Sequence, residues 1–352
     1  MEKYRIDLNK GLEFGLYSIG DHLLNPYTGS RISAEQRIRE LIEASKLADE
    51  AGLDVFAVGE SHQTHFTTQA HTVILGAIAQ ATKNIKIASS ATVLSVSDPV
   101  RVYEDFATLD LISNGRAEIV AGRGSRIGAY SLLGYDVRDY EELFEEKLEL
   151  LLKINNEDRV TWEGQFRAPL ENAYILPQPL NGHMPIWRAV GGPPASAIKA
   201  GNAGVPMMLT TLGGPAKNFK ISVDAYREAA AQNGFDSSEL PIATTSLFYT
   251  AENSQDALRE YYPHVNTGMQ ALRGGGYPKQ QFAQAVDYRD ALMIGSPQQI
   301  IEKMHYQYEL YGQQRFMAQI DFGGVPFDKI LKNIELIATE ILPAVRKFTV
   351  KK

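Results

Sequence analysis

Short apolar runs alternate with amphipathic stretches along most of this chain. The apolar runs are four to eight residues long, as buried strands usually are, and they occupy residues 12–17, 55–58, 85–91, 117–121, 186–190, 205–209, 242–249 and 316–320. Helical periodicity fills residues 34–51, 69–81, 99–113, 140–155, 194–203, 216–233, 254–262, 297–311 and 326–347. Strands regularly separated by helices indicate parallel pairing through crossover helices. Eight such units favour a single (β/α)8 barrel domain over residues 1–352, with an open doubly wound sheet as the alternative.

Two segments interrupt the alternation. Residues 156–184 contain Pro177, Pro179 and the pair Asn181-Gly182, which predict short strands and turns. Residues 264–290 contain the run Gly274 to Gly276, which is typical of a mobile loop or a small insertion. In a barrel we expect both to rise from the face that carries the chemistry, where they would be candidate lids, with a passive surface insertion as the alternative, above all for residues 156–184.

Composition narrows the classes of protein that this chain can belong to. A hydrophobic share of 44% and a charged share of 22% are ordinary for a globular protein. The net charge of −7, without a long basic block, argues against nucleic acid as a main partner. The absence of cysteine excludes disulfides, thiolate ligands and a cysteine nucleophile. With no long apolar run and no apolar N-terminal segment, we expect a cytoplasmic protein without a membrane partner.

The most informative stretch is residues 97–125. Asp98-Pro99 predicts the start of a helix, Asn114-Gly115 its end, and residues 117–121 a buried strand. The next residues combine uncovered backbone amides with cationic side chains, in the order Gly122, Arg123, Gly124, Ser125 and Arg126. This combination suits an anion such as phosphate, and a solvated turn is the alternative interpretation.

A second glycine turn, Gly191-Gly192, follows another predicted strand and leads into a helix. The first amides of that helix and the Ser196 hydroxyl would also face an anion. Because both turns follow barrel strands, they would share one rim. The sequence therefore predicts a phosphorylated ligand.

Polar residues also follow the strand at residues 55–58. His62 and His65 have a spacing that a metal could use, but no set of carboxylates accompanies them, and we expect no metal. His62 is better suited to donate to a bound polar ring or to transfer a proton, with Glu60 orienting it. A purely structural hydrogen bond is the alternative.

Three common catalytic or nucleotide motifs are missing. Gly122, Gly124 and Gly128 place the third glycine one position late for a dinucleotide fingerprint. The chain contains no GxxxxGK[ST] loop and no GxSxG elbow. These gaps argue against a dinucleotide enzyme of the Rossmann type, a P-loop enzyme and a serine hydrolase.

Several blocks of this sequence resemble the bacterial luciferase-like flavin monooxygenase family. They are GESHQTHF at 59–66, SSATVLSVSDPVRVYEDFATLDLISNGRAEIVAGRGS at 89–125 and ILPQPLNGHMPIWRAVGG at 175–192. The chain is more similar to the uncharacterised oxidoreductases of this family than to its light-emitting subunits. The resemblance implies a (β/α)8 barrel that binds reduced FMN from a separate flavin reductase. It also implies that dioxygen is used to oxidise a small organic substrate, and that the protein is a homodimer through the helices at 69–81 and 99–113.

The resemblance also assigns site residues. Ser89 and Ser90 would lie against the flavin ring, where a cis peptide is sometimes found. Arg123, between Gly122 and Gly124, would contact the flavin phosphate, and the phosphate-binding helix start would fall on Gly191, Gly192 and Ser196.

Two departures separate this chain from the light-emitting subunits. Those subunits have two adjacent histidines after the glutamate, where this chain has Ser61-His62, so aldehyde-dependent light emission is not expected. A second phosphate-binding arginine falls near Glu141, which has the opposite charge, and Arg126 and Tyr140 are the candidate replacements.

Two other functions remain open. One is hydride transfer with a deazaflavin cofactor, and the other is a flavin-binding protein without catalysis. Aromatic residues near the rim suggest an apolar substrate, although each also suits a core position: Phe14, Tyr17, Phe66 and Trp187.

Overall fold

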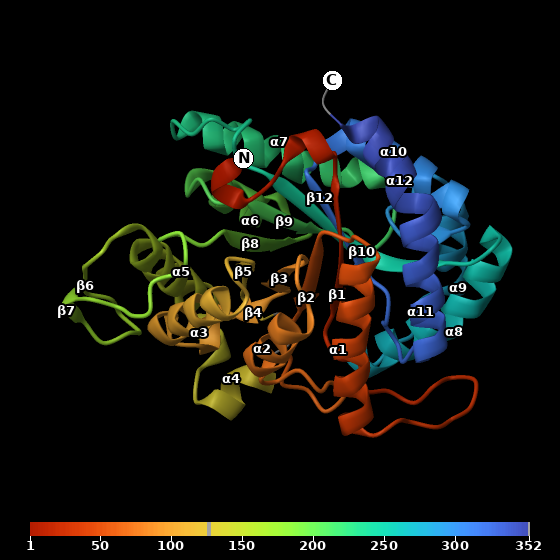
Figure 1. Ribbon diagram of the computed structural model, residues 1–352, viewed down its shortest axis with the longest axis horizontal. Coiled ribbons are helices and arrows are strands. Elements are labelled where there is room, and N and C mark those ends of the chain that lie inside the picture. The colour runs from red at the N-terminus through yellow and green to blue at the C-terminus, as the bar shows by residue number, and fades with distance from the viewer. Residues whose placement is uncertain (125–127, 351–352) are drawn as a thin grey trace.

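The computed structural model describes residues 1–124 and 128–350, and its centre is a closed barrel of parallel strands (Figure 1). Eight strands among the described residues form the ring, in the order β12, β1, β2, β3, β5, β8, β9, β10. β10 closes it by pairing with both β12 and β9. Their bounds are β1 Glu13–Ser18, β2 Val55–Val58, β3 Lys86–Ser89, β5 Ala117–Gly122, β8 Ile186–Gly191, β9 Met207–Thr210, β10 Ile242–Thr250 and β12 Arg315–Gln319. The predicted (β/α)8 barrel is therefore confirmed.

Helices cover the outside of this barrel (Figure 1). The long ones are α1 Ala34–Glu50, α2 His71–Ala81, α3 Pro99–Ile112, α5 Tyr140–Asn156, α6 Pro194–Asn202, α7 Lys220–Gln232, α8 Ser254–Arg273, α10 Pro297–Tyr311, α11 Phe327–Leu336 and α12 Leu342–Thr349. Shorter elements are α4 Gly128–Leu133, α9 Lys279–Phe282, β4 Thr92–Val93 and β11 Met293–Gly295. No helix in the described part of the chain is both long enough and apolar enough to cross a membrane.

Side-chain caps mark several of the helix starts that the sequence predicts. Asp98 accepts a hydrogen bond from the Val100 amide, and Pro99 occupies the first turn of α3. Ser33 caps α1 through the Gln36 amide in the same way. Each cap satisfies a backbone donor that has no partner within the helix.

α8 is longer than the sequence predicts. The predicted helix stops at Tyr262, before Pro263, whereas α8 continues to Arg273 and ends at Gly274 in the left-handed conformation. A proline inside a helix leaves the carbonyl four residues earlier without its donor. Here the Tyr27 hydroxyl donates to that carbonyl, Arg259 O, at 3.2 Å. The first ten residues of the predicted loop 264–290 are therefore helical.

The insertion at 156–184 forms the expected short strands, β6 Val160–Trp162 and β7 Leu170–Ala173, which pair antiparallel. It joins the end of α5 to the start of β8, so its two ends lie at the amino end of the barrel. None of its described residues lines the central cavity. The expectation that it is a lid on the catalytic face is wrong, because only connections from a strand to the next helix reach that face.

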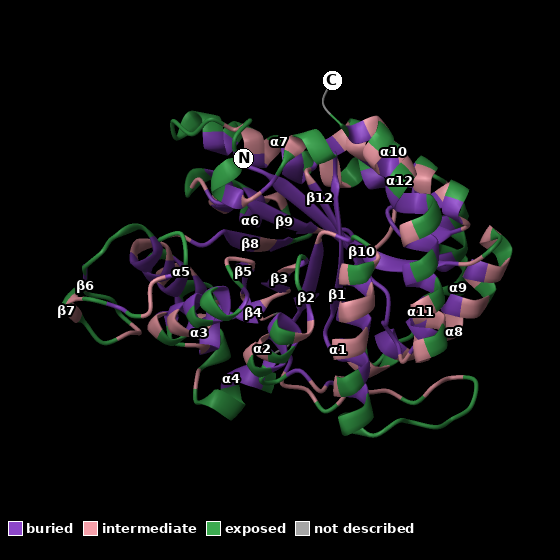
Figure 2. Ribbon diagram, in the orientation of Figure 1, coloured by how far each residue is buried: buried purple, intermediate pink, exposed green. Residues whose placement is uncertain are grey.

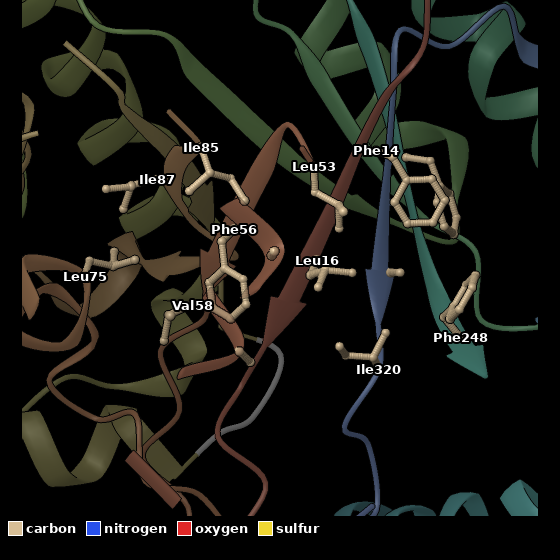
Figure 3. Packing of buried hydrophobic residues seen from close by; sticks show 14 of the residues in the cluster. Phe14, Leu16, Leu53, Phe56, Val58, Leu75, Ile85, Ile87, Phe248 and Ile320 are labelled. Atoms are coloured by element: carbon tan, nitrogen blue, oxygen red, sulfur yellow. The ribbon is translucent and has the colours of Figure 1, made fainter. Parts of the chain in front are cut away.

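The core lies mainly between the barrel wall and the helices. Figure 3 shows Phe14, Leu16, Phe56 and Val58 among the buried side chains of this layer. Figure 2 shows the strands buried and the outer faces of the helices exposed. This arrangement holds the carboxyl ends of the strands in place around one opening.

Charged side chains close the opposite, amino end of the barrel interior. Arg315 donates to Glu118 at 2.6 and 3.0 Å and to Glu13 at 2.8 Å. Lys86 pairs with Glu13, and the Trp187 indole donates to Glu118 at 3.0 Å. Burial opposes ionisation of Glu118, but Arg315 and Lys86 outweigh it and lower the pKa of this carboxyl. This buried ionic floor, defined by Glu13, Lys86, Glu118 and Arg315, lies beneath the cavity described below.

Candidate active site

A cavity of about 470 Å³ opens at the carboxyl ends of the barrel strands. This volume is in the range of small-molecule and cofactor sites. Most of the residues that the sequence singles out line it, namely Glu60, His62, Ser90, Gly122, Arg123, Gly124, Tyr140 and Gly191. Ser89, Gly192 and Ser196 do not line it.

Glu60 connects the end of β2 to the turn after β3. Its amide donates to Ala91 O at 2.9 Å, and its Oε2 accepts from the Val93 amide at 2.7 Å. Its other oxygen, Oε1, lies 2.6 Å from His62 Nε2. The carboxylate is therefore held by the backbone and in turn orients the imidazole, so His62 is held at the cavity wall.

His71 lies behind this pair. Its Nε2 is 2.8 Å from the Thr92 hydroxyl, and its Nδ1 is 3.8 Å from Glu60 Oε2. Burial lowers the pKa of His71 to about 4 despite the nearby Glu60. His71 is therefore neutral near pH 7.

The turn after β3 contains a cis peptide between Ser90 and Ala91. Gly59 allows this turn to approach β2 closely, because a Cβ at Gly59 would lie 2.2 Å from Ser90 O. Ser90 reaches the cavity, whereas Ser89 is fully buried and forms hydrogen bonds to the neighbouring strand. The Ser89 hydroxyl donates to Val120 O at 3.1 Å and accepts from Val120 N at 2.9 Å. The prediction that Ser89 lies against a bound ring does not match this position.

Arg123 follows β5, between two glycines that let the loop lie close to the turn after β3. A Cβ at Gly124 would lie 2.4 Å from Val93 Cγ1, and Gly124 has φ +73°. The Arg123 guanidinium lies 5.3 Å from the centre of the Tyr140 ring and donates to Glu141 Oε1 at 3.2 Å. Arg126, one of the suggested replacements for the second arginine, lies outside the described residues.

Glu141 belongs to a chain of alternating charges that begins at Arg123. Lys199, on α6, donates to Glu141 at 3.0 Å and lies 3.2 Å from Glu145, which pairs with Arg188 at 2.6 Å. The hydrogen bond from Lys199 lowers the pKa of Glu141, so this carboxylate is ionised near pH 7. This chain of charges has three cations, Arg123, Lys199 and Arg188, and two carboxylates, Glu141 and Glu145, so its net charge is +1. Lys199 was not predicted, because it is 58 positions from Glu141 in the sequence and only the fold brings the two together.

The glycine turn after β8 reaches the same cavity through Gly191, whereas Ser196 lies buried behind the turn. Gly191 lines the cavity and Gly192 adopts φ +56°. Ser196, in the first turn of α6, is buried, and its hydroxyl oxygen has no hydrogen-bond partner among the described residues. An unsatisfied hydroxyl beside a helix start and a nearby arginine fit the phosphate of a flavin nucleotide.

The other side of the cavity consists of residues that the sequence did not single out as a group. Tyr17 lines the cavity and donates to Gln319 Oε1 at 3.0 Å, whereas Phe14, Phe66 and Trp187 do not line it. The apolar members of this side are Leu247, Met269, Leu272 and Phe322. Residues 269–273 belong to the predicted insertion 264–290, which therefore does reach the cavity.

Within the described ranges, no three His, Asp or Glu side chains gather closely enough to hold a metal ion. The His62–His65 spacing therefore belongs to no metal-ligand cluster there. The polar groups at the cavity include the Glu60–His62 pair and two arginines, Arg123 and Arg273. They suit an organic ligand that carries an anionic group.

The fold and the site define a (β/α)8-barrel protein with a ligand cavity at the carboxyl ends of its strands and a phosphate-suited loop on the rim. The family model for luciferase-like monooxygenases matches residues 13–314. The chain belongs to this family.

Three solved structures show how widely the same fold is used. The monooxygenase RslO1 from Streptomyces bottropensis has a TM-score of 0.83 at 24% identity, over 94% of this chain and 99% of that one. The oxygenating constituent of 3,6-diketocamphane monooxygenase from Pseudomonas putida, in complex with FMN, has a TM-score of 0.74 at 20% identity, over 95% and 98%. An F420-dependent secondary alcohol dehydrogenase has a TM-score of 0.72 at 19% identity, over 95% and 99%. At these identities the likeness concerns the fold.

Proposed function

We propose that this protein is the oxygenase component of an FMN-dependent monooxygenase. It takes reduced FMN from a separate flavin reductase and uses dioxygen to oxidise a small, largely apolar organic substrate. The observation that carries the proposal is that one cavity joins the Arg123 loop to the Glu60–His62 pair. The family match and the FMN complex of a protein with the same fold support it.

Each part of the cavity has a role in this proposal. Arg123, the amides after Gly122 and Gly191, and the Ser196 hydroxyl hold the phosphate. The open Ser90 turn accommodates the flat ring. His62, oriented by Glu60, donates or accepts a proton beside that ring. Reduced FMN supplies the electrons for dioxygen, and the apolar residues of α8 exclude water from the reacting atoms.

The proposal includes a homodimer through α2 and α3. Val73 on α2 is 71% exposed, and Leu111 and Ile112 at the end of α3 are also exposed. Apolar side chains this exposed are costly to leave in water and suit a protein interface. Sedimentation of the wild-type protein and of Val73→Glu tests this part, because the charge should shift the protein to monomers.

The central test is rapid mixing of anaerobic, reduced, FMN-loaded protein with oxygenated buffer. We expect oxidised FMN to return more slowly than it does free in solution, with delayed release of hydrogen peroxide. His62→Gln should keep FMN affinity but change this time course. Reoxidation at the rate of free FMN, with immediate and complete peroxide release, would contradict a monooxygenase and favour a flavin-binding protein without catalysis.

One observation favours a second candidate, a deazaflavin-dependent oxidoreductase. Glu141 offsets part of the charge of Arg123, which suits a phosphodiester with one negative charge better than a monoester with up to two. The fold is also that of an F420-dependent dehydrogenase. Parallel titrations with FMN and F420 separate the candidates, since the true cofactor should bind more tightly by at least an order of magnitude.

A further inference from the structure

Gln319 lies across the barrel from the loop suited to phosphate. In the closed ring of strands, β12 is four places from β5, so Gln319 at the end of β12 and Arg123 directly after β5 lie at the ends of opposite strands. Tyr17, on β1, stands opposite Gly191 on β8 in the same way. The cavity therefore has Arg123 at one end and the uncharged Gln319 at the opposite end.

The Gln319 carboxamide has one satisfied atom and one unsatisfied atom. Its side chain is only 4% exposed and lines the cavity. Its oxygen accepts from the Tyr17 hydroxyl at 3.0 Å, and its Nε2 has no hydrogen-bond partner among the described residues. Buried amide donors are nearly always paired in folded proteins, so an exception at a cavity wall points to a ligand acceptor.

The surroundings restrict the ligand further. Leu247, Met269, Leu272 and Phe322 share this side of the cavity and offer apolar contact area, and Arg273, which follows Leu272 at the end of α8, also lines the cavity. A ligand that satisfies both features has an apolar body and one neutral oxygen acceptor. Arg273 is exposed and makes no hydrogen bond to the buried Gln319 within the described ranges, so a carboxylate held by Gln319 alone would be buried without a cation, which is costly.

We infer that Gln319, oriented by Tyr17, binds the carbonyl oxygen of the organic substrate. This inference rests on the proposed function in one respect: the cavity binds an organic substrate in addition to the flavin. The flavin ring also carries carbonyl oxygens and has the same acceptor chemistry. The position of Gln319 opposite the phosphate-suited loop favours the substrate, and not the flavin ring, as the molecule that supplies the carbonyl oxygen.

The test uses a ketone and its isostere, cyclohexanone and methylenecyclohexane, which differ in replacing the oxygen by a CH2 group. Ligand-observed NMR titrations of the flavin-free protein give both affinities. We expect cyclohexanone to bind about fivefold to tenfold more tightly, as one hydrogen bond to an otherwise unsatisfied donor allows. Gln319→Leu should remove this preference by weakening only the ketone.

Gln313→Leu is the matched control, because Gln313 is also a buried glutamine with an unsatisfied side-chain atom but does not line the cavity. It should leave the ketone preference intact. Equal affinities for the two ligands in the wild-type protein, or a preference that survives Gln319→Leu, would overturn the inference.

Titration with oxidised FMN forms the second arm. We expect Gln319→Leu to bind FMN as the wild type does. A loss of FMN affinity with an unchanged ketone preference would assign the donor to the flavin ring and overturn the inference. Failure of the proposed function would instead appear as absent FMN binding by the wild-type protein, which leaves the flavin-free ketone experiment interpretable.

Discussion

Replacing Arg123 by alanine tests the phosphate-binding loop most directly. The Arg123 side chain is 19% exposed and reaches the cavity, with Tyr140 beneath it and Glu141 beside it. A charge-assisted contact of this kind contributes about 1.5 to 3 kcal/mol. We therefore expect Arg123→Ala to weaken FMN binding about 10-fold to 150-fold.

Substitution of Glu141 separates two contributions to the loss of FMN affinity in Arg123→Ala, the lost contact and the repulsion by Glu141. Without Arg123, this carboxylate would face the phosphate with Lys199 as its partner, which adds repulsion to the lost contact. Glu141 is 53% exposed, so its pair with Arg123 contributes no more than about 1 kcal/mol. Glu141→Gln alone should tighten FMN binding by up to about fivefold, and it should reduce the effect of Arg123→Ala in the double variant.

The assay is quenching of flavin fluorescence at fixed ionic strength, with riboflavin as the control ligand because it lacks the phosphate. Arg123→Ala should lower the affinity for FMN and leave that for riboflavin nearly unchanged. Equal FMN affinity in the wild type and the variant would remove Arg123 from the phosphate site. An equal loss for both ligands would show that the substitution disturbs the ring pocket instead.

Three further predictions concern the barrel and its opening. Burial lowers the pKa of His71 from 6.5 to about 4, so between these pH values only the unfolded chain takes up a proton at this residue. The free energy of unfolding should therefore fall by up to ~3 kcal/mol as the pH drops from 6.5 to 4. Urea titrations of His71→Gln should show a flatter dependence, and an equal slope would contradict this. Glu118→Gln leaves Arg315 in the buried ionic floor short of a partner and should cost about 3 to 5 kcal/mol in urea unfolding, whereas a loss below about 1 kcal/mol would show that the floor tolerates an unpaired charge. Shortening the glycine turn at 274–276, beyond the buried part of α8, should increase hydrogen peroxide release without changing the melting temperature, and an unchanged release would exclude a gating role for this segment.

Local patterns in the sequence predicted the barrel because the residues that specify each of its strands and helices lie within a short stretch. Val55–Val58 is an apolar run with the length of a strand, and Asp98-Pro99 caps and starts α3 without help from distant residues. Pro263 shows the limit of such rules. It predicts a helix end, but Tyr27, more than 200 residues earlier, supplies the hydrogen bond that the helix lacks.

The candidate site likewise has features that local sequence predicts and features that only the fold creates. The Arg123 loop and the Glu60–His62 pair were recognisable from sequence, because each lies within one turn after a strand. Lys199 at Glu141 and Gln319 at Tyr17 were not, since barrel closure and helix packing create these neighbours.

By itself, the sequence determined the order of strands and helices, the lack of thiol chemistry and two loops with the donors that an anion needs. Only the tertiary structure decided that both loops share one cavity, that Ser89 serves the sheet while Ser90 reaches the opening, and that Gln319 stands opposite Arg123. The physical reason is that a strand's register and the ring's closure set which side chains face inward and which face each other, and both depend on every strand at once.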